Sequence, residues 1–65
     1  MSFGERLKEL RNEKKMTQSD VGKIINVSKA SVSLYEKNER TPDQDSIKKL
    51  ASYFNVSTDF LLGVT

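Results

Sequence analysis

The segment 28–37, SKASVSLYEK, carries the side chains best suited to bind another surface. Its expected outward positions hold short residues, Ser28, Ala30 and Ser33, and Lys29 stands near its start. A solvated helix normally exposes Glu, Lys, Gln and Arg, which favour the helix and keep a surface soluble. Hydroxyl and ammonium groups donate hydrogen bonds. The pattern therefore indicates that something other than water lies against this face.

The composition leaves little room for catalytic chemistry. The chain has no cysteine and no histidine, which removes disulfides, zinc-finger sites, thiol nucleophiles and imidazole bases. It also lacks a phosphate-binding loop motif, and Asp43 and Asp45 are typical of carboxylates at a helix start rather than of a catalytic pair. We therefore expect no enzymatic activity, no metal and no cofactor.

Length and charge describe a small, slightly basic chain. Its 65 residues suffice for one domain, spanning residues 1–65. The net charge of +2, from 11 Lys and Arg against 9 Asp and Glu, is compatible with a nucleic-acid partner but does not require one. There is no apolar run near the ~18 residues of a membrane span and no secretion signal. We expect a cytoplasmic protein that does not enter the membrane.

The spacing of apolar residues predicts an all-α domain of five short helices and no sheet. Apolar residues recur at helical intervals, as in Phe3, Leu7 and Leu10, and no run alternates with the period of a strand. Asn26 is expected to adopt the left-handed conformation that ends a helix. The five helices are expected to begin at the N-cap residues Ser2, Thr17, Ser28, Asp43 and Ser57.

The second and third helices form a predicted helix-turn-helix over about residues 17–37. They are separated only by the break Asn26-Val27, and so short a turn makes the helices cross steeply. Gly22 lies inside the second helix, where it costs about 1 kcal/mol relative to alanine. Its presence predicts that another helix approaches closely there. Tyr35 and Tyr53 are expected to be core aromatics.

Two stretches carry a resemblance to a known family: MTQSDVGKIINVSKASVSLYEK and ERTPDQDSIKKLASYFNVSTDFLLG. Together they resemble the lambdoid phage repressor and Cro-like helix-turn-helix family, also called the XRE family. The resemblance covers almost all of the chain, and it is the joint spacing of the features that is specific. It implies a compact lambda repressor-like domain whose third helix enters the major groove of DNA and whose dimer reads a near-palindromic operator.

The resemblance also implies roles for residues at the DNA surface. Lys29 would donate to guanine O6 and N7 and Ser33 to several base edges, while Ala30 and Leu34 would pack on thymine methyl groups. Two alternatives stay open: Lys29 as a phosphate contact or a solvated lysine, and Leu34 at the edge of the core. The predicted phosphate contacts, which position the domain without reading sequence, are Thr17, Gln18, Ser28, Lys37, Asn38 and Arg40.

Two further expectations concern structure rather than DNA. Arg11 and Glu36 match an ion pair of the family that joins the first helix to the end of the third. Phe60, Leu61 and Leu62 match the region that helps to form the dimer, although all three could instead close the monomer core. We expect a division, with some in the core and one or two in a small interface.

The predicted function is sequence-specific binding of double-stranded DNA. The expected role is a bacterial or phage transcriptional repressor that acts as a homodimer on its operator. The alternative is an antitoxin or regulatory module whose main role is to bind a partner protein. An enzyme is the weakest reading, because the chain offers nothing to carry catalysis.

Overall fold

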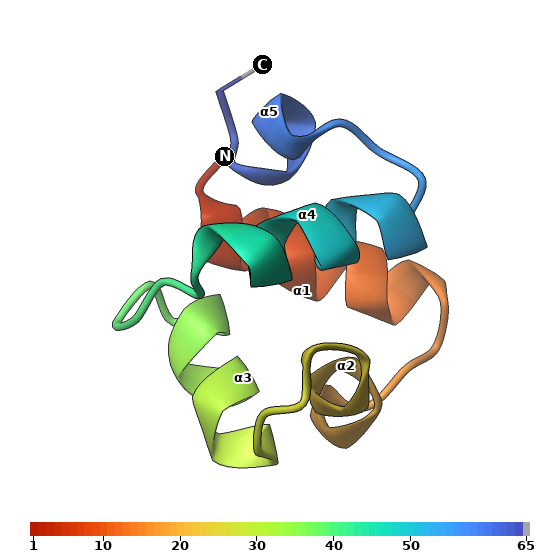
Figure 1. Ribbon diagram of the computed structural model, residues 1–65, viewed down its shortest axis with the longest axis vertical. Coiled ribbons are helices and arrows are strands. Elements are labelled where there is room, and N and C mark those ends of the chain that lie inside the picture. Colours follow the sequence, from red (N-terminus) through yellow and green to blue (C-terminus); the bar gives the residue numbers. More distant parts are fainter. Residues whose placement is uncertain (65) are drawn as a thin grey trace.

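The structure, a computed structural model, describes residues 1–64 and folds them into five α-helices with no strand (Figure 1). The all-α prediction is therefore confirmed. Within this part of the chain, none of the helices has the length and apolar character that crossing a membrane requires. The helices are α1 (Phe3–Glu13), α2 (Gln18–Ile25), α3 (Lys29–Glu36), α4 (Gln44–Tyr53) and α5 (Thr58–Leu61).

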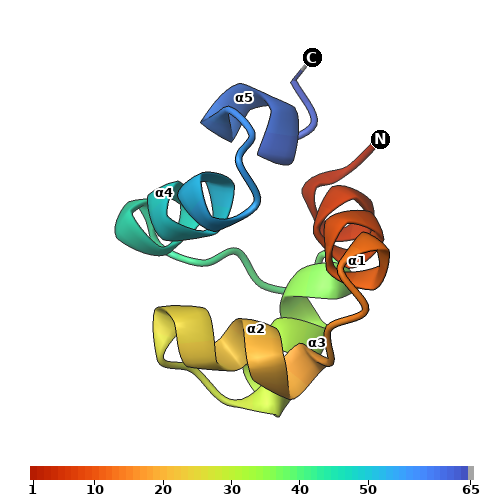
Figure 2. The same ribbon diagram turned by 90° about the vertical axis from the view of Figure 1, so that its right-hand side faces the viewer.

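The helices surround a single core. Figure 2 shows α1 and α4 on opposite sides of the molecule, with α5 and the N-terminus at one end and α2 and α3 at the other. A Cβ on Gly63 would collide with the carbonyl oxygen of Met1, so the chain comes back to its start after α5. The core itself contains Leu7, Leu10, Val21, Ile25, Val32, Tyr35, Ile47, Leu50, Ala51, Phe54 and Leu61.

Each helix begins at the N-cap residue that the sequence predicts. In every case the cap side chain accepts a hydrogen bond from the backbone N–H three residues later, one of the groups that a helix start leaves without a partner. In α1 and α2 the bond is reciprocated, because Glu5 and Asp20 accept from the backbone N–H of the cap. Asn26 ends α2 with φ of 58°, in the left-handed conformation expected of it.

These caps lower the pKa of three carboxylates, those of Glu5, Asp20 and Asp43. The backbone N–H of Ser2 and then its hydroxyl lower the pKa of Glu5 from 4.5. Thr17 acts in the same way on Asp20, and the backbone N–H of Ser46 acts on Asp43, each from 3.8. Since the pKa of each group is lower in the folded than in the unfolded chain, each stabilises the fold above the unfolded value.

Acid is therefore expected to destabilise the domain. The contribution of the three carboxylates is complete above about pH 5 and is lost as the pH falls through their folded-state pKa values. Thermal unfolding between about pH 6 and about pH 2.5 measures the effect. The triple variant Glu5→Gln, Asp20→Asn, Asp43→Asn should lose less of its melting temperature over this range than the parent. Equal losses would contradict the assignment.

Tyr53 is not a core residue, and that prediction is wrong. Its side chain is 48% exposed, because the neighbouring Phe54 takes the inward position at the end of α4. The Tyr53 ring meets the Phe54 ring edge-on, with centroids 5.2 Å apart, and the ammonium nitrogen of Lys14 lies 5.9 Å from the Tyr53 centroid. Tyr35, by contrast, is buried in the core as expected.

The close approach predicted at Gly22 exists, but the neighbour is different. A Cβ on Gly22 would lie 2.5 Å from the carbonyl oxygen of Val27, in the turn of the helix-turn-helix, and not against another helix. The tight contact between helices occurs instead at Gly4. There a Cβ would lie 2.6 Å and 2.5 Å from the carbonyl oxygens of Tyr35 and Glu36, at the end of α3. The backbones of α1 and α3 therefore touch.

Candidate nucleic-acid interface

The outward face of α3 is the core of the candidate site. Val32 and Tyr35 are buried and hold the helix on the domain. On the other side Lys29 and Ala30 are exposed. In Figure 1 the helix lies at the edge of the molecule, next to α2. With short residues outside, the α3 backbone is open to close approach by another surface.

The remaining two predicted base-reading residues are less open. Ser33 and Leu34 are both partly buried: helical spacing places Ser33 between Lys29 and Ala30, and Leu34 beyond Ala30. The partial burial of Leu34 fits the alternative that it lies at the edge of the core, and its remaining exposed surface is still available to a methyl group. Lys29 and Ala30 therefore stand out as the residues that a partner meets first.

The hydroxyls at the starts of α2 and α3 are occupied by capping. Thr17 Oγ1 accepts from Asp20 N at 3.0 Å, and Ser28 Oγ accepts from Ser31 N at 3.2 Å. Ser28 Oγ also donates to Ser31 Oγ at 3.3 Å. A phosphate at either helix start would therefore meet mainly the backbone N–H groups of the first turn that the cap does not satisfy. Gln18 is partly buried, and its Nε2 donates to Glu36 Oε1 at 3.1 Å, which ties the start of α2 to the end of α3.

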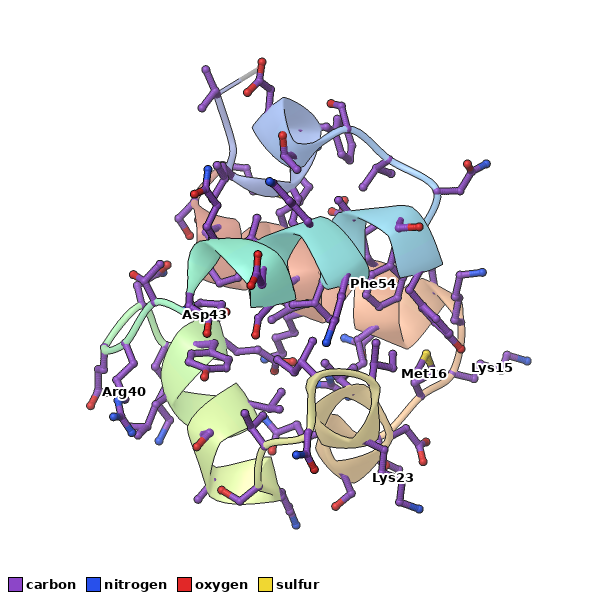
Figure 3. The ribbon with its side chains drawn as sticks, viewed as in Figure 1. Lys15, Met16, Lys23, Arg40, Asp43 and Phe54 are labelled. Carbon is purple, nitrogen blue, oxygen red and sulfur yellow. The ribbon has the colours of Figure 1, made fainter. Side chains whose placement is uncertain are left out.

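The loop between α3 and α4 carries the other predicted phosphate contacts. Lys37, Asn38 and Arg40 are all exposed, and the loop projects from the side of the domain (Figure 1). Figure 3 shows Arg40 on this projecting loop. Asn38 differs from the two cations, because its side-chain amide bonds to the start of α1: Gly4 N donates to Oδ1 at 2.9 Å.

The ion pair between Arg11 and Glu36 is present and is bidentate. Arg11 Nε donates to Glu36 Oε2 at 2.6 Å and Nη2 donates to Oε1 at 3.1 Å, with the side chains only 12% and 4% exposed. Arg11 Nη1 also donates to the carbonyl oxygen of Met16 at 2.9 Å. Together with Gln18, the pair connects α1, α2 and α3 behind the exposed face of α3.

Comparison with known proteins fits this geometry. A family model described as "Helix-turn-helix" matches residues 7–61. The chain belongs to the helix-turn-helix family. It is 44% identical over 63 residues to the transcriptional regulator ImmR of Bacillus subtilis, a match that covers 97% of this chain and 50% of ImmR. The chain thus spans about half the length of this helix-turn-helix relative.

Solved helix-turn-helix structures have the same fold. The c2 repressor of Salmonella phage P22, in complex with a synthetic operator, superposes with a TM-score of 0.88 at 31% identity, covering 95% of this chain and 94% of that one. A transcriptional regulator from Listeria innocua superposes with a TM-score of 0.92 at 32% identity, covering 95% of this chain and 58% of that one. The XRE-type repressor fold that the sequence indicates is confirmed.

Phe60, Leu61 and Leu62, in and just after α5 of this helix-turn-helix domain, differ in their exposure. Leu61 is wholly buried and closes the monomer core, which is the alternative given above for these residues. Phe60 is partly buried, and the Arg6 guanidinium carbon lies 3.8 Å from the centroid of its ring. Leu62 is 37% exposed and is the member of the three that remains available to a second chain.

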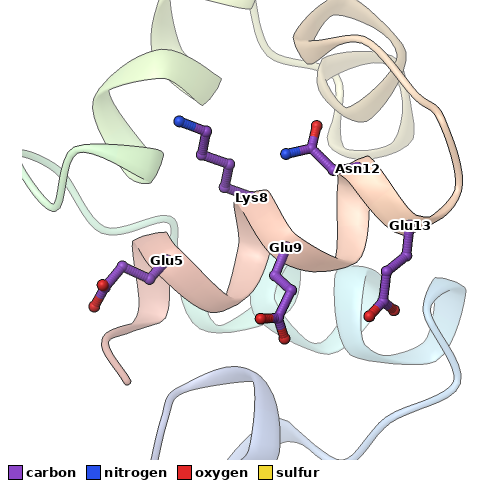
Figure 4. Close-up of a pocket in the computed structure, with 5 residues that line it drawn as sticks. All are labelled: Glu5, Lys8, Glu9, Asn12 and Glu13. Carbon is purple, nitrogen blue, oxygen red and sulfur yellow. The ribbon is translucent and has the colours of Figure 1, made fainter.

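The outer face of α1 differs in charge from the α3 face of the helix-turn-helix. A shallow pocket there is lined by Glu5, Lys8, Glu9, Asn12 and Glu13 (Figure 4). Glu9 and Glu13 point to one side of α1 in Figure 4, and Lys8 and Asn12 to the other. Three carboxylates and one lysine give this pocket a net negative charge, which disfavours contact with a polyanion such as nucleic acid.

Proposed function

We propose that this chain is a sequence-specific, double-stranded DNA-binding domain of a transcriptional regulator and that it acts as a repressor by occupying an operator. The observation that carries the proposal is the exposed, short-residue face of α3, with Lys29 and Ala30 outermost. A helix with such a face fits the major groove. The likeness to the operator-bound c2 repressor supports the same docking.

In this proposal the contacts fall into two classes. Lys29 and Ser33 read base edges by hydrogen bonds, and Ala30 and Leu34 pack against thymine methyl groups. The starts of α2 and α3, at Thr17, Gln18 and Ser28, and the cations of the α3–α4 loop hold phosphates. Because two of the four base readers are apolar, the shape and deformability of the DNA carry a larger share of the specificity.

We further propose that two copies bind one near-palindromic operator. The net charge of +2 gives each copy only a small non-specific attraction to DNA, so pairing of copies raises the affinity. Three exposed apolar side chains are available for pairing: Met1 and Val64 are 61% and 70% exposed, and Leu62 is 37% exposed. Affinities for such specific sites are about 10⁻⁸ to 10⁻¹¹ M. The protein would then work in the cytoplasm, at the nucleoid.

Selection of binding sites from random double-stranded DNA tests the proposal. We expect enrichment of a two-fold symmetric sequence, and no enrichment even at low salt would contradict DNA binding and favour a module that binds a partner protein. Lys29→Ala should bind the selected site about 10- to 100-fold more weakly while keeping the parent's thermal stability. Lys48→Ala, which removes an exposed lysine from α4, is the matched control and should bind as the parent does.

The pattern of loss distinguishes the roles of Lys29. If Lys29→Ala loses affinity for the selected site alone, Lys29 contacts a base. If it loses affinity equally for all sequences, Lys29 contacts a phosphate. If Lys29→Ala bound every sequence as tightly as the parent, the assignment of this face of α3 as the recognition surface would be wrong.

A further inference from the structure

The loop between α3 and α4 needs an anchor if its cations are to meet phosphates at fixed places. Its backbone is held at the beginning, where Asn38 N donates to Tyr35 O at 3.1 Å and Glu39 N donates to Leu34 O at 2.9 Å. At its other end Pro42 is buried. Lys37 and Arg40 themselves are exposed. Without further contacts, the direction of the loop would depend on these two ends alone.

The side chain of Asn38 supplies the missing contact. Its Oδ1 accepts from the backbone N–H of Gly4 at 2.9 Å, and its Nδ2 donates to Ser2 Oγ at 3.0 Å. These bonds join residues 34 and 36 positions apart in the chain. The backbone of Asn38 has φ of 61°, so the chain reverses at the residue whose side chain makes the connection.

The bond to Gly4 has a physical reason on the side of α1. The first N–H groups of a helix have no partner within it. Ser2 satisfies the N–H of Glu5 from next to the helix, at 3.3 Å, and Asn38 satisfies the N–H of Gly4 from the far end of α3. The helix start is therefore completed only when the loop is in place, and the absence of a side chain at Gly4 lets the end of α3 come close enough.

We propose that Asn38 is a positioning residue for DNA binding: it fastens the loop that carries Lys37 and Arg40 to the start of α1. This assignment replaces the direct phosphate contact predicted for Asn38, and it rests on the proposed function. The two cations grip phosphates at the places that the fastened loop gives them. Without Asn38 the side chains of Lys37 and Arg40 sample many positions. Binding must then order them, and the lost conformational entropy weakens the affinity for DNA.

The amide is the side chain that fits both partners. Ser2 Oγ donates its single proton to Glu5 Oε1, at 2.9 Å, and so can only accept from residue 38. An aspartate would keep the acceptor for the N–H of Gly4 but would compete with Glu5 for that proton. A glycine would keep the left-handed backbone and lose both bonds.

Two variants and a matched control test the proposal in the full chain. Asn38→Gly removes both side-chain bonds, and Asn38→Asp removes one. Asn55→Gly is the control, because Asn55 also ends a helix in the left-handed conformation, at φ of 57°, and its side chain makes no hydrogen bond within residues 1–64. Two measurements are made: hydrogen exchange of the Gly4 amide without DNA, and DNA affinity as a function of salt.

In Asn38→Gly we expect the Gly4 amide to exchange about tenfold faster or more. Affinity for every DNA sequence should fall about 5- to 30-fold with unchanged site preference, and the salt dependence should weaken by about one phosphate contact, a slope change of about 0.9. Asn38→Asp should lie between Asn38→Gly and the parent in both measurements. Asn55→Gly should match the parent in both.

Several results would overturn the proposal. Faster exchange with unchanged affinity and salt slope would show that the connection exists but does not position the cations. Reduced affinity with unchanged exchange would show that Asn38 contacts phosphate directly. A parent chain that binds no DNA would overturn the proposed function together with the positioning role, whereas a binding parent matched by Asn38→Gly would overturn the positioning role alone.

Discussion

Replacing Arg11 with alanine is expected to lower the free energy of unfolding by about 3 to 5 kcal/mol. Within residues 1–64, the change leaves the amide of Gln18 as the one remaining hydrogen-bond partner of the Glu36 carboxylate, which is 4% exposed. It also removes the bond from Arg11 to the carbonyl oxygen of Met16. A domain of this size has only about 3 to 10 kcal/mol in total. The variant should therefore be partly unfolded at room temperature, as urea unfolding followed by circular dichroism would show.

Two comparisons separate the ion pair from other effects of the change. Lys8→Ala removes a cation from the exposed face of the same helix and should alter the stability by no more than about 0.5 kcal/mol. The double variant Arg11→Met, Glu36→Met replaces the buried pair with apolar side chains and should recover most of the loss. An Arg11→Ala variant as stable as Lys8→Ala would show that the pair contributes nothing.

Replacing Gly4 with alanine is expected to destabilise the domain by about 2 to 3 kcal/mol. On an isolated helix the same change would stabilise by about 1 kcal/mol, because alanine favours the helix. Here the new methyl group would lie 2.5 Å from the carbonyl oxygen of Glu36, a backbone atom held by the rest of α3, so α1 and α3 must separate. Urea unfolding gives the size and the sign of the change.

The sign of that change is the critical result. Asn12→Ala, at an exposed position of the same helix, should leave the stability unchanged or raise it slightly. If Gly4→Ala were stabilised to the same extent, the backbones of α1 and α3 would not be in contact. If Gly4→Ala were both less stable and weaker in DNA affinity, the contact between α1 and α3 would set the position of α3 as well as contribute to stability.

Features set by neighbours in the chain were predictable from the sequence. A cap needs only the residue itself and the helix start that follows, so Ser57 before Thr58 is enough to place α5. The stripe Ile47, Leu50 and Ala51 follows from helical spacing alone and is buried. Asn26 ends α2 because asparagine tolerates the left-handed conformation, which is again a local property.

Contacts between distant segments could not be predicted in the same way. A glycine at the start of a helix has many explanations, and nothing near Gly4 in the sequence points to the end of α3. The side chain of Asn38 meets its partners only because five helices close around one core. The pairing of Arg11 with Glu36 was predicted by family resemblance and not from the residues themselves, since charged side chains 25 positions apart have many other partners.

In the candidate site, too, the features set by local sequence were predictable and those set by distant contacts were not. The exposure of Lys29 and Ala30 follows from the burial of Val32 and Tyr35 on the same helix, which periodicity indicates. Leu34 lies between these faces, so helical spacing alone does not fix its degree of burial. The prediction for Tyr53 failed because local sequence could not decide which of two adjacent aromatic residues faces the core. At the end of α4 only one of them can point inward, and packing selects Phe54.

The contact between Gly63 and Met1 gives the folded chain nearly the geometry of a closed ring. A short linker could join these two segments and the domain could be opened at another loop, so the domain suits circular permutation. The N-terminus and the segment that follows α5 lie at the side of the molecule away from α2 and α3 (Figure 2), so a label attached to either segment projects away from α3.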